Sequence, residues 1–102
     1  MKILVICSGG MSTSLLVSKM KKMAGEQKEE IIIEAGAVSD LSKNAANCDV
    51  IMVAPQVRHR LNEIKEITDK YNKVTLLIEP QVYGLVDGKG ALKQAIDAFN
   101  VR

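Results

Sequence analysis

Residues 7–14 carry the residue types of a phosphate-binding loop that follows a nucleophile. Two consecutive glycines allow backbone conformations with positive φ, so successive N–H groups can turn inward around an anion. Hydroxyl side chains supply further donors, and a helix that begins near residue 12 or 13 would aim its free N–H groups at the same point. Such a cradle fits one phosphate dianion, and we expect it to comprise Ser8, Gly9, Gly10, Met11, Ser12, Thr13 and Ser14.

Cys7 is the candidate nucleophile of this loop. A thiol beside a helix N-terminus can have its pKa lowered from about 8.5 into the range of roughly 3.5–7.5, which produces a thiolate at neutral pH. A lone cysteine in a strand is more often a small buried hydrophobe. Because the glycines and hydroxyls follow Cys7 directly, we favour a covalent phosphocysteine intermediate.

Four apolar runs rich in Val and Ile predict the strands that position this loop. They are continuous rather than alternating, which is typical of strands buried on both faces of a parallel sheet. They occupy residues 3–6, 31–33, 50–54 and 74–78. A weaker helical segment, residues 39–46 with Ser39 as its cap, is expected between the second and third strands.

Three longer helices are predicted from apolar residues that recur at helical spacing. Their stripes are Leu16, Met20, Met23 and Ala24, then Val57, Leu61, Ile64 and Ile67, and finally Leu92, Ala95, Ile96 and Phe99. Strands that alternate with helices imply right-handed crossovers and a parallel sheet with helices on both faces. We therefore expect an α/β three-layer sandwich, flavodoxin-like, whose four-stranded sheet has the order 2-1-3-4.

This topology predicts where ligands bind. In open parallel sheets the ligand lies at the carboxyl ends of the strands, beside the first strand. The segments expected at that edge are residues 7–14, 35–39, 55–56 and 79–87. Cys48 precedes the third strand and should lie at the opposite edge, too far from Cys7 for a disulfide. We interpret Cys48 as structural.

Composition excludes several classes of function. The net charge is only +2, the charges are dispersed, and three aromatic residues are present, so we expect no nucleic-acid partner. No nucleotide-binding fingerprint occurs, and a single histidine with two separated cysteines gives no metal site, so no cofactor is expected. No stretch approaches the roughly 20 apolar residues that cross a bilayer. We expect a cytoplasmic protein of one domain, residues 1–102.

Three motifs carry a resemblance to a known family. The chain resembles, over essentially its whole length, enzyme IIB of the bacterial phosphotransferase system, lactose/cellobiose branch. The first motif is the most specific, and the other two add weight together. The motifs are Ile6-Cys7-Ser8-Gly9-Gly10-Met11-Ser12-Thr13-Ser14, Pro55-Gln56-Val57 and Tyr83-Gly84-Leu85-Val86-Asp87-Gly88.

The resemblance implies a phosphoryl relay. A phosphohistidine on enzyme IIA would donate to Cys7, and Cys7 would phosphorylate a sugar that enters through the membrane enzyme IIC. The sugar would typically be a β-linked disaccharide such as cellobiose, chitobiose or lactose. The protein would be cytoplasmic and would reach the inner face of the membrane transiently through enzyme IIC. Candidate docking residues for these partners are Pro55, Gln56, Arg58 and Tyr83.

The basic triplet Arg58-His59-Arg60, which follows the second motif, has two interpretations. Arg58 and Arg60 either attract an acidic face of enzyme IIA or are simply solvated. His59 either pairs with Cys7 in catalysis or lies on the helix surface. We favour the surface position, because a catalytic pair requires hydrogen-bond reach.

A phosphatase is the main alternative. Low-molecular-weight tyrosine phosphatases and related arsenate reductases are similar in topology, but their loop places arginine six residues after the cysteine. Here that position is Thr13, and the nearest counterpart of an Asp-Pro general acid reads Glu79-Pro80. An arginine at the position of Thr13 would stabilise the transition state for hydrolysis. We therefore favour a carrier, and a non-enzymatic phosphate-binding module remains a second alternative.

Overall fold

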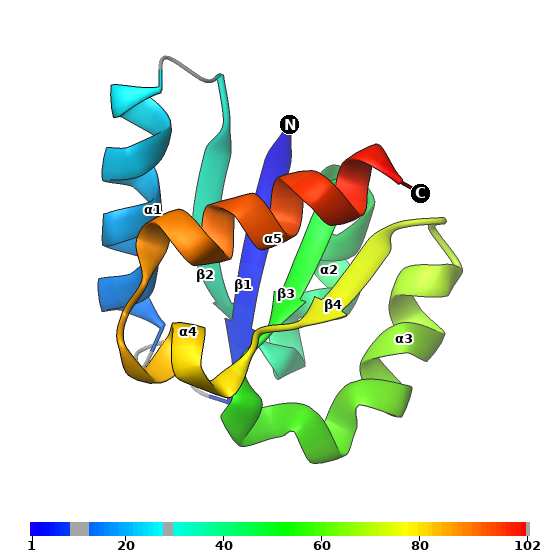
Figure 1. The fold of residues 1–102 in the computed structure, drawn as a ribbon. Coiled ribbons are helices and arrows are strands. Elements are labelled where there is room, and N and C mark those ends of the chain that lie inside the picture. Colours follow the sequence, from blue (N-terminus) through cyan, green and yellow to red (C-terminus); the bar gives the residue numbers. More distant parts are fainter. Residues whose placement is uncertain (9–12, 28–29, 102) are drawn as a thin grey trace.

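The computed structural model describes residues 1–8, 13–27 and 30–101, and its core is one parallel sheet (Figure 1). The strand order is β2-β1-β3-β4, which confirms the predicted order 2-1-3-4. The strands are β1 (Lys2–Cys7), β2 (Ile32–Ala37), β3 (Val50–Val53) and β4 (Val74–Leu77).

Helices cover both faces of the sheet, as predicted. The helices α1 and α5 pack over one face, and α2 and α3 pack over the other (Figure 1). Their bounds, with the short α4, are α1 (Ser14–Glu26), α2 (Leu41–Asn44), α3 (Leu61–Asp69), α4 (Pro80–Gly84) and α5 (Gly88–Asn100). Three 3-10 turns complete the chain: η1 (Val38–Asp40), η2 (Ala45–Asn47) and η3 (Pro55–Arg60). In the described part of the chain, no helix has the length and apolarity to cross a membrane.

The central strand β1 is buried on both faces, which explains its continuous apolar run. Successive side chains of a strand point to opposite faces. Ile3 and Val5 accordingly pack under α1 and α5, whereas Leu4 and Ile6 pack under α2 and α3. All four are at most 3% exposed. Burial of these side chains against two helical layers fixes the position of β1 within the molecule.

The register of the sheet brings the predicted functional segments to one edge. Ile6 of β1 pairs with Val53 of β3, which in turn pairs with Leu77 of β4. The strands therefore end at nearly the same level, and Cys7 lies one residue beyond it, paired with Ala37 of β2. The start of α1, η3 and α4 all gather below these strand ends (Figure 1).

Two local predictions need correction. Ser39 caps no helix, because it lies inside η1. The residues that directly precede η1 and α2 are Ala37 and Asp40, and neither makes a side-chain cap. The chain passes from extended backbone at Ala37 directly into the 3-10 turn, so the helical segment starts before Ser39. The second difference is α4, which forms within residues 79–87, where we expected only a connecting segment. Pro80 at its first position was the available signal.

The first turn of α5 packs against the backbone of α1 at Gly88. A Cβ at this position would lie 2.7 Å from the Lys19 carbonyl carbon, closer than real Cβ contacts. Gly88→Ala should therefore lower the free energy of unfolding by about 1–3 kcal/mol, as overpacking does. Urea denaturation followed by circular dichroism measures the change.

Gly25→Ala is the matched control for this prediction. Gly25 also lies in a helix, but a Cβ there would meet no atom within 4 Å. The control should leave stability unchanged or raise it by up to about 1 kcal/mol, because alanine favours helix. Equal effects of the two substitutions would contradict the packing argument.

Candidate active site

The predicted nucleophile lies at the end of the central strand. Cys7 is 1% exposed, and its Sγ accepts a hydrogen bond from Thr13 Oγ1 at 3.9 Å. Thr13 is itself fully buried, and its carbonyl oxygen accepts the N–H of Val17 at 2.9 Å. Thr13, six residues after Cys7 and directly before α1, thus contacts the Cys7 side chain.

The start of α1 favours an anion beside Cys7. Thr13 is the residue before the helix, its side chain makes no cap, and the first turn contains no acidic residue. The positive end of the helix dipole is therefore not offset by a carboxylate of its own first turn. Stabilisation of an anion at such a position is worth about 0.3–1 kcal/mol at exposed sites and up to about 2 kcal/mol when partly buried.

Only part of the predicted cradle lies within the described residues. Ser8 follows β1 and is exposed, Thr13 is buried against Cys7, and Ser14 is the exposed first residue of α1. These three residues flank both ends of the predicted loop. The other four predicted members, Gly9, Gly10, Met11 and Ser12, lie outside the described residues.

The four predicted docking residues line one groove of about 660 Å³, which we call the η3–α4 groove. Gln56 and Arg58 are exposed on η3, while Pro55 and Tyr83 are partly buried. Tyr83 packs against both apolar cores, which anchors α4 beneath the sheet edge. Sequence reasoning did not name as docking residues the remaining members of the lining: His59, Pro80 and Gly84.

The two arginines of the basic triplet differ in their contacts. Arg60 forms an exposed ion pair with Glu63 at 2.9 Å, and this hydrogen bond lowers the pKa of the Glu63 carboxyl. Arg58 makes no ion pair with any residue that the structure describes. His59 is exposed on η3, as we favoured, whereas Cys7 is buried. Of the triplet, Arg58 and His59 face the groove.

Cys48 lies at the opposite edge of the sheet, as predicted. Val50, two residues after Cys48, pairs with Ile3, four residues before Cys7. Six residue positions correspond to on the order of 20 Å along the strand direction. Cys7 and Cys48 are not joined in a disulfide. Burial raises the pKa of the Cys48 thiol, which keeps it protonated and unreactive at neutral pH.

The comparison with known families identifies the chain. The model of the lactose/cellobiose-specific IIB subunit of the PTS, the phosphoenolpyruvate:carbohydrate phosphotransferase system, matches residues 2–94. The chain belongs to this family. It is a PTS IIB component, a phosphotransferase that carries a phosphoryl group in sugar uptake, as the resemblance implied.

Relatives and solved structures match along nearly the whole chain. The oligo-β-mannoside-specific EIIB component of Bacillus subtilis is 39% identical over 93% of this chain and 92% of its own. The cellobiose-specific EIIB component of Lactococcus lactis is 32% identical over 96% and 95%. The cellobiose-specific IIB protein of Borrelia burgdorferi superposes with a TM-score of 0.83 at 38% identity, covering 98% of this chain and 92% of that one.

Some relatives are much longer. A lactose-specific EIICB component of Lactococcus lactis is 30% identical over 88% of this chain, which corresponds to 16% of that protein. The IIB fold therefore occurs both in proteins of this size and as a small part of larger EIICB components.

The raised pKa of Cys48 predicts a change in stability at alkaline pH. Between the unfolded thiol pKa, about 8.5, and the higher folded value, the native state binds more protons than the unfolded state. The stability of wild type should therefore fall relative to Cys48→Ala as pH rises above about 8.5, by up to about 1.4 kcal/mol per pH unit. Urea denaturation at pH 7, 8, 9 and 10 measures both proteins; parallel curves would contradict the assignment.

Proposed function

We propose that Cys7 accepts a phosphoryl group from a phosphohistidine of an enzyme IIA and transfers it to a sugar carried by a membrane enzyme IIC. The observation that supports this proposal most directly is the hydrogen bond from Thr13 Oγ1 to Cys7 Sγ at the start of α1. It places the sulfur beside a hydroxyl donor and the positive end of a helix dipole, both of which stabilise a thiolate.

The first half-reaction forms the phosphocysteine. The Cys7 thiolate attacks phosphorus, an S–P bond forms, and the N–P bond of the donor breaks. The electron pair of that bond returns to the imidazole nitrogen of the donor histidine, which regains its neutral form after proton exchange with water. The N–H groups and hydroxyls of the predicted cradle would hold the equatorial oxygens during this step.

The second half-reaction releases the group to the sugar. A sugar hydroxyl attacks phosphorus, the S–P bond breaks, the hydroxyl proton leaves to solvent, and Cys7 returns to its thiolate. A carrier must survive between the two steps without hydrolysis. The phosphatase alternative would need arginine at the place of Thr13, and that side chain is fully buried against Cys7, where a guanidinium does not fit without rearrangement.

Both steps require Cys7 Sγ to become accessible. Cys7 as a whole residue is only 1% exposed. We propose that a local rearrangement at the carboxyl edge accompanies transfer. We propose that partner binding in the adjacent η3–α4 groove, where Arg58 has no intramolecular ion pair within the described chain, takes part in this step.

The relatives bear on the partners and the sugar. The lactose-specific EIICB components join the B and C parts in one component, which supports an enzyme IIC partner for this chain and a site of action at the inner face of the membrane. Relatives are named for oligo-β-mannoside, galactose and cellobiose. We propose a β-linked disaccharide as the sugar, with its choice made by enzyme IIC.

The test of the proposal is mass spectrometry after incubation with phosphoenolpyruvate and the upstream phosphotransferase proteins. Wild type should gain one phosphoryl group on Cys7 and none on Cys48. Cys7→Ser should abolish transfer without unfolding, because the side chain changes by one atom. Cys48→Ser, the matched control, should keep transfer at a stability cost of about 1–2 kcal/mol, because it places a hydroxyl in the core. Label on a histidine would refute the proposal.

The contact between Thr13 and Cys7 makes a second prediction. Thr13→Val keeps the shape of the buried side chain but removes the hydroxyl donor to sulfur, so less thiolate should be present at pH 7. Because a hydrogen bond to a charged group is worth about 1.5–3 kcal/mol, the alkylation and phosphorylation rates of Cys7 should fall roughly tenfold or more.

Thr13→Ser is the control for this effect. Serine retains the hydroxyl and should restore most of both rates, whereas a purely structural role of the threonine methyl group would leave the serine variant as slow as the valine variant. Alkylation against pH, with thermal unfolding as a check on folding, distinguishes the two outcomes.

A further inference from the structure

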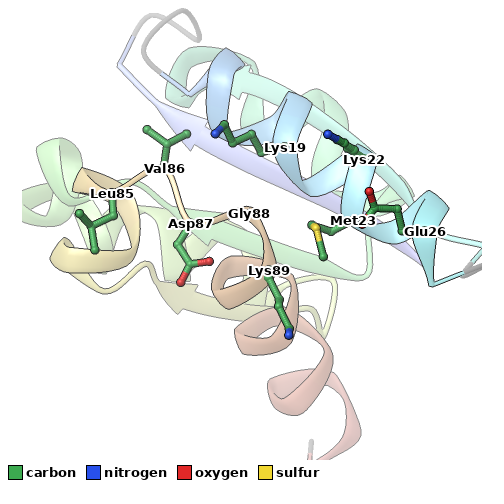
Figure 2. A pocket seen from close by; sticks show the side chains of 9 residues that line it. All are labelled: Lys19, Lys22, Met23, Glu26, Leu85, Val86, Asp87, Gly88 and Lys89. Carbon is green, nitrogen blue, oxygen red and sulfur yellow. The ribbon is translucent and has the colours of Figure 1, made fainter.

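A second groove, of about 490 Å³, lies between α1 and the segment that enters α5; we call it the α1–α5 groove (Figure 2). Lys19, Lys22 and Met23 line it from α1, and Leu85, Val86 and Lys89 line it from the other side. Gly84 belongs to the η3–α4 groove and Leu85 to this one. The two grooves therefore meet at the end of α4, beside the edge where β1 ends.

Backbone geometry fixes the shape of this groove. The turn after α4 is closed by hydrogen bonds from Val86 N to Tyr83 O at 3.1 Å and from Asp87 N to Val82 O at 2.9 Å. Val86 adopts φ 51°, a left-handed conformation that is rare for a β-branched residue. The turn leaves Leu85 78% exposed. An apolar side chain of this size is thus displayed at the rim.

The groove has a positively charged rim. Lys19, Lys22 and Lys89 form no ion pair among the described residues, whereas Lys2, Arg60 and Lys93 each do. Two carboxylates also line the groove. That of Asp87 points toward the first turn of α5 and accepts the Gly90 N–H at 2.9 Å, and Glu26 lies at the far end of α1 (Figure 2). At the end nearest α4, Lys19 reaches toward Val86, while Lys22 and Lys89 lie farther along the groove (Figure 2).

The same face of α1 continues from the groove toward Cys7. Leu15 lies four residues before Lys19, one helical turn closer to the start of α1, and is 58% exposed. Lys22 lies three residues beyond Lys19 on the same face. Two exposed leucines and unpaired lysines thus form one surface that extends from the candidate active site into the groove.

We propose that the α1–α5 groove and Leu15 bind an acidic face of the phosphoryl donor, with an apolar side chain of the donor seated beside Leu85. This inference rests on the proposed function. A donor that arrives by diffusion gains from unpaired lysines, because complementary charge accelerates encounter. The dianionic phosphoryl group also makes the loaded donor more negative than the spent one.

The concave form of the site favours a protein over a lipid surface. A protruding side chain can fill a groove of this size, whereas a bilayer meets a protein across its convex surface. Leu85 supplies apolar contact at one end of the groove, and Lys19, Lys22 and Lys89 supply charge farther along it (Figure 2). The expected occupant is therefore an acidic segment that carries one exposed apolar residue.

The test measures the second-order rate of Cys7 phosphorylation by phosphorylated enzyme IIA at several salt concentrations. The variant Lys19→Gln/Lys22→Gln/Lys89→Gln should be about tenfold slower than wild type at low salt and should lose most of the salt dependence. Leu85→Ser should also be slower than wild type, and its ratio to the wild-type rate should not change with salt concentration, because this substitution removes an apolar contact. Thermal unfolding verifies that each variant is folded.

The matched control removes three exposed lysines elsewhere, as Lys43→Gln/Lys65→Gln/Lys70→Gln, with the same change of net charge. It should keep the wild-type rate. An equally slow control, or an unchanged groove variant, overturns the inference while wild-type phosphorylation on Cys7 leaves the proposed function intact. Absence of label on wild-type Cys7 would instead refute the proposed function. Groove-dependent binding to vesicles of 30% phosphatidylglycerol in phosphatidylcholine, with an unchanged donor rate, would assign the surface to the membrane.

Discussion

The pairing of β1 with both of its neighbours is the constraint on which the candidate site depends. Ile6 is held at the level of Val53, and Cys7 is held beside Ala37, by parallel hydrogen-bonded ladders on either side. Apolar side chains lock the same strand between two helical layers. The last residue of β1 therefore has little freedom, and the sulfur that it carries meets the Thr13 hydroxyl at a position set by the whole sheet.

The chemistry expected of a carrier agrees with this rigid frame. A phosphotransfer intermediate must form readily and hydrolyse slowly, so its site needs anion stabilisation without the parts that activate water. A buried threonine and the positive end of α1 meet the first requirement. The same burial shields Cys7, which is the basis of the proposal that partner binding opens access to it. Burial of Cys7 and its contact with Thr13 thus both follow from its place at the end of β1.

The short helix α4 connects the candidate site to the surfaces that partners would use. Tyr83 holds it against both cores, and the sharp turn at Val86 redirects the chain into α5. The η3–α4 groove lies on one side of this element and the α1–α5 groove on the other. Gly88, which lines the second groove, permits the close approach of α5 to the Lys19 backbone.

The sequence by itself determined the presence of four strands, the layer arrangement and the family, although β2 extends to Ala37, beyond the predicted residues 31–33; the loop chemistry at Cys7 stays a prediction. These follow from local patterns: continuous apolar runs, helical periodicity, and a glycine- and hydroxyl-rich segment after a strand. The placement of Cys48 at the far edge also followed, because strand direction in a parallel sheet leaves one outcome. In each case the physical cause acts between residues close in sequence, or through a topology with few alternatives.

Only the tertiary structure decided which surface residues act together. The Arg60–Glu63 pair has a local i,i+3 spacing, but only the fold shows that Arg58 lies beside Pro80, Tyr83 and Gly84 at the groove. The α1–α5 groove joins segments about sixty residues apart, and one side of it is a turn in which Val86 adopts a conformation its residue type disfavours. Such features arise from long-range packing, in which the energy of the whole core outweighs local preference, so no local pattern records them.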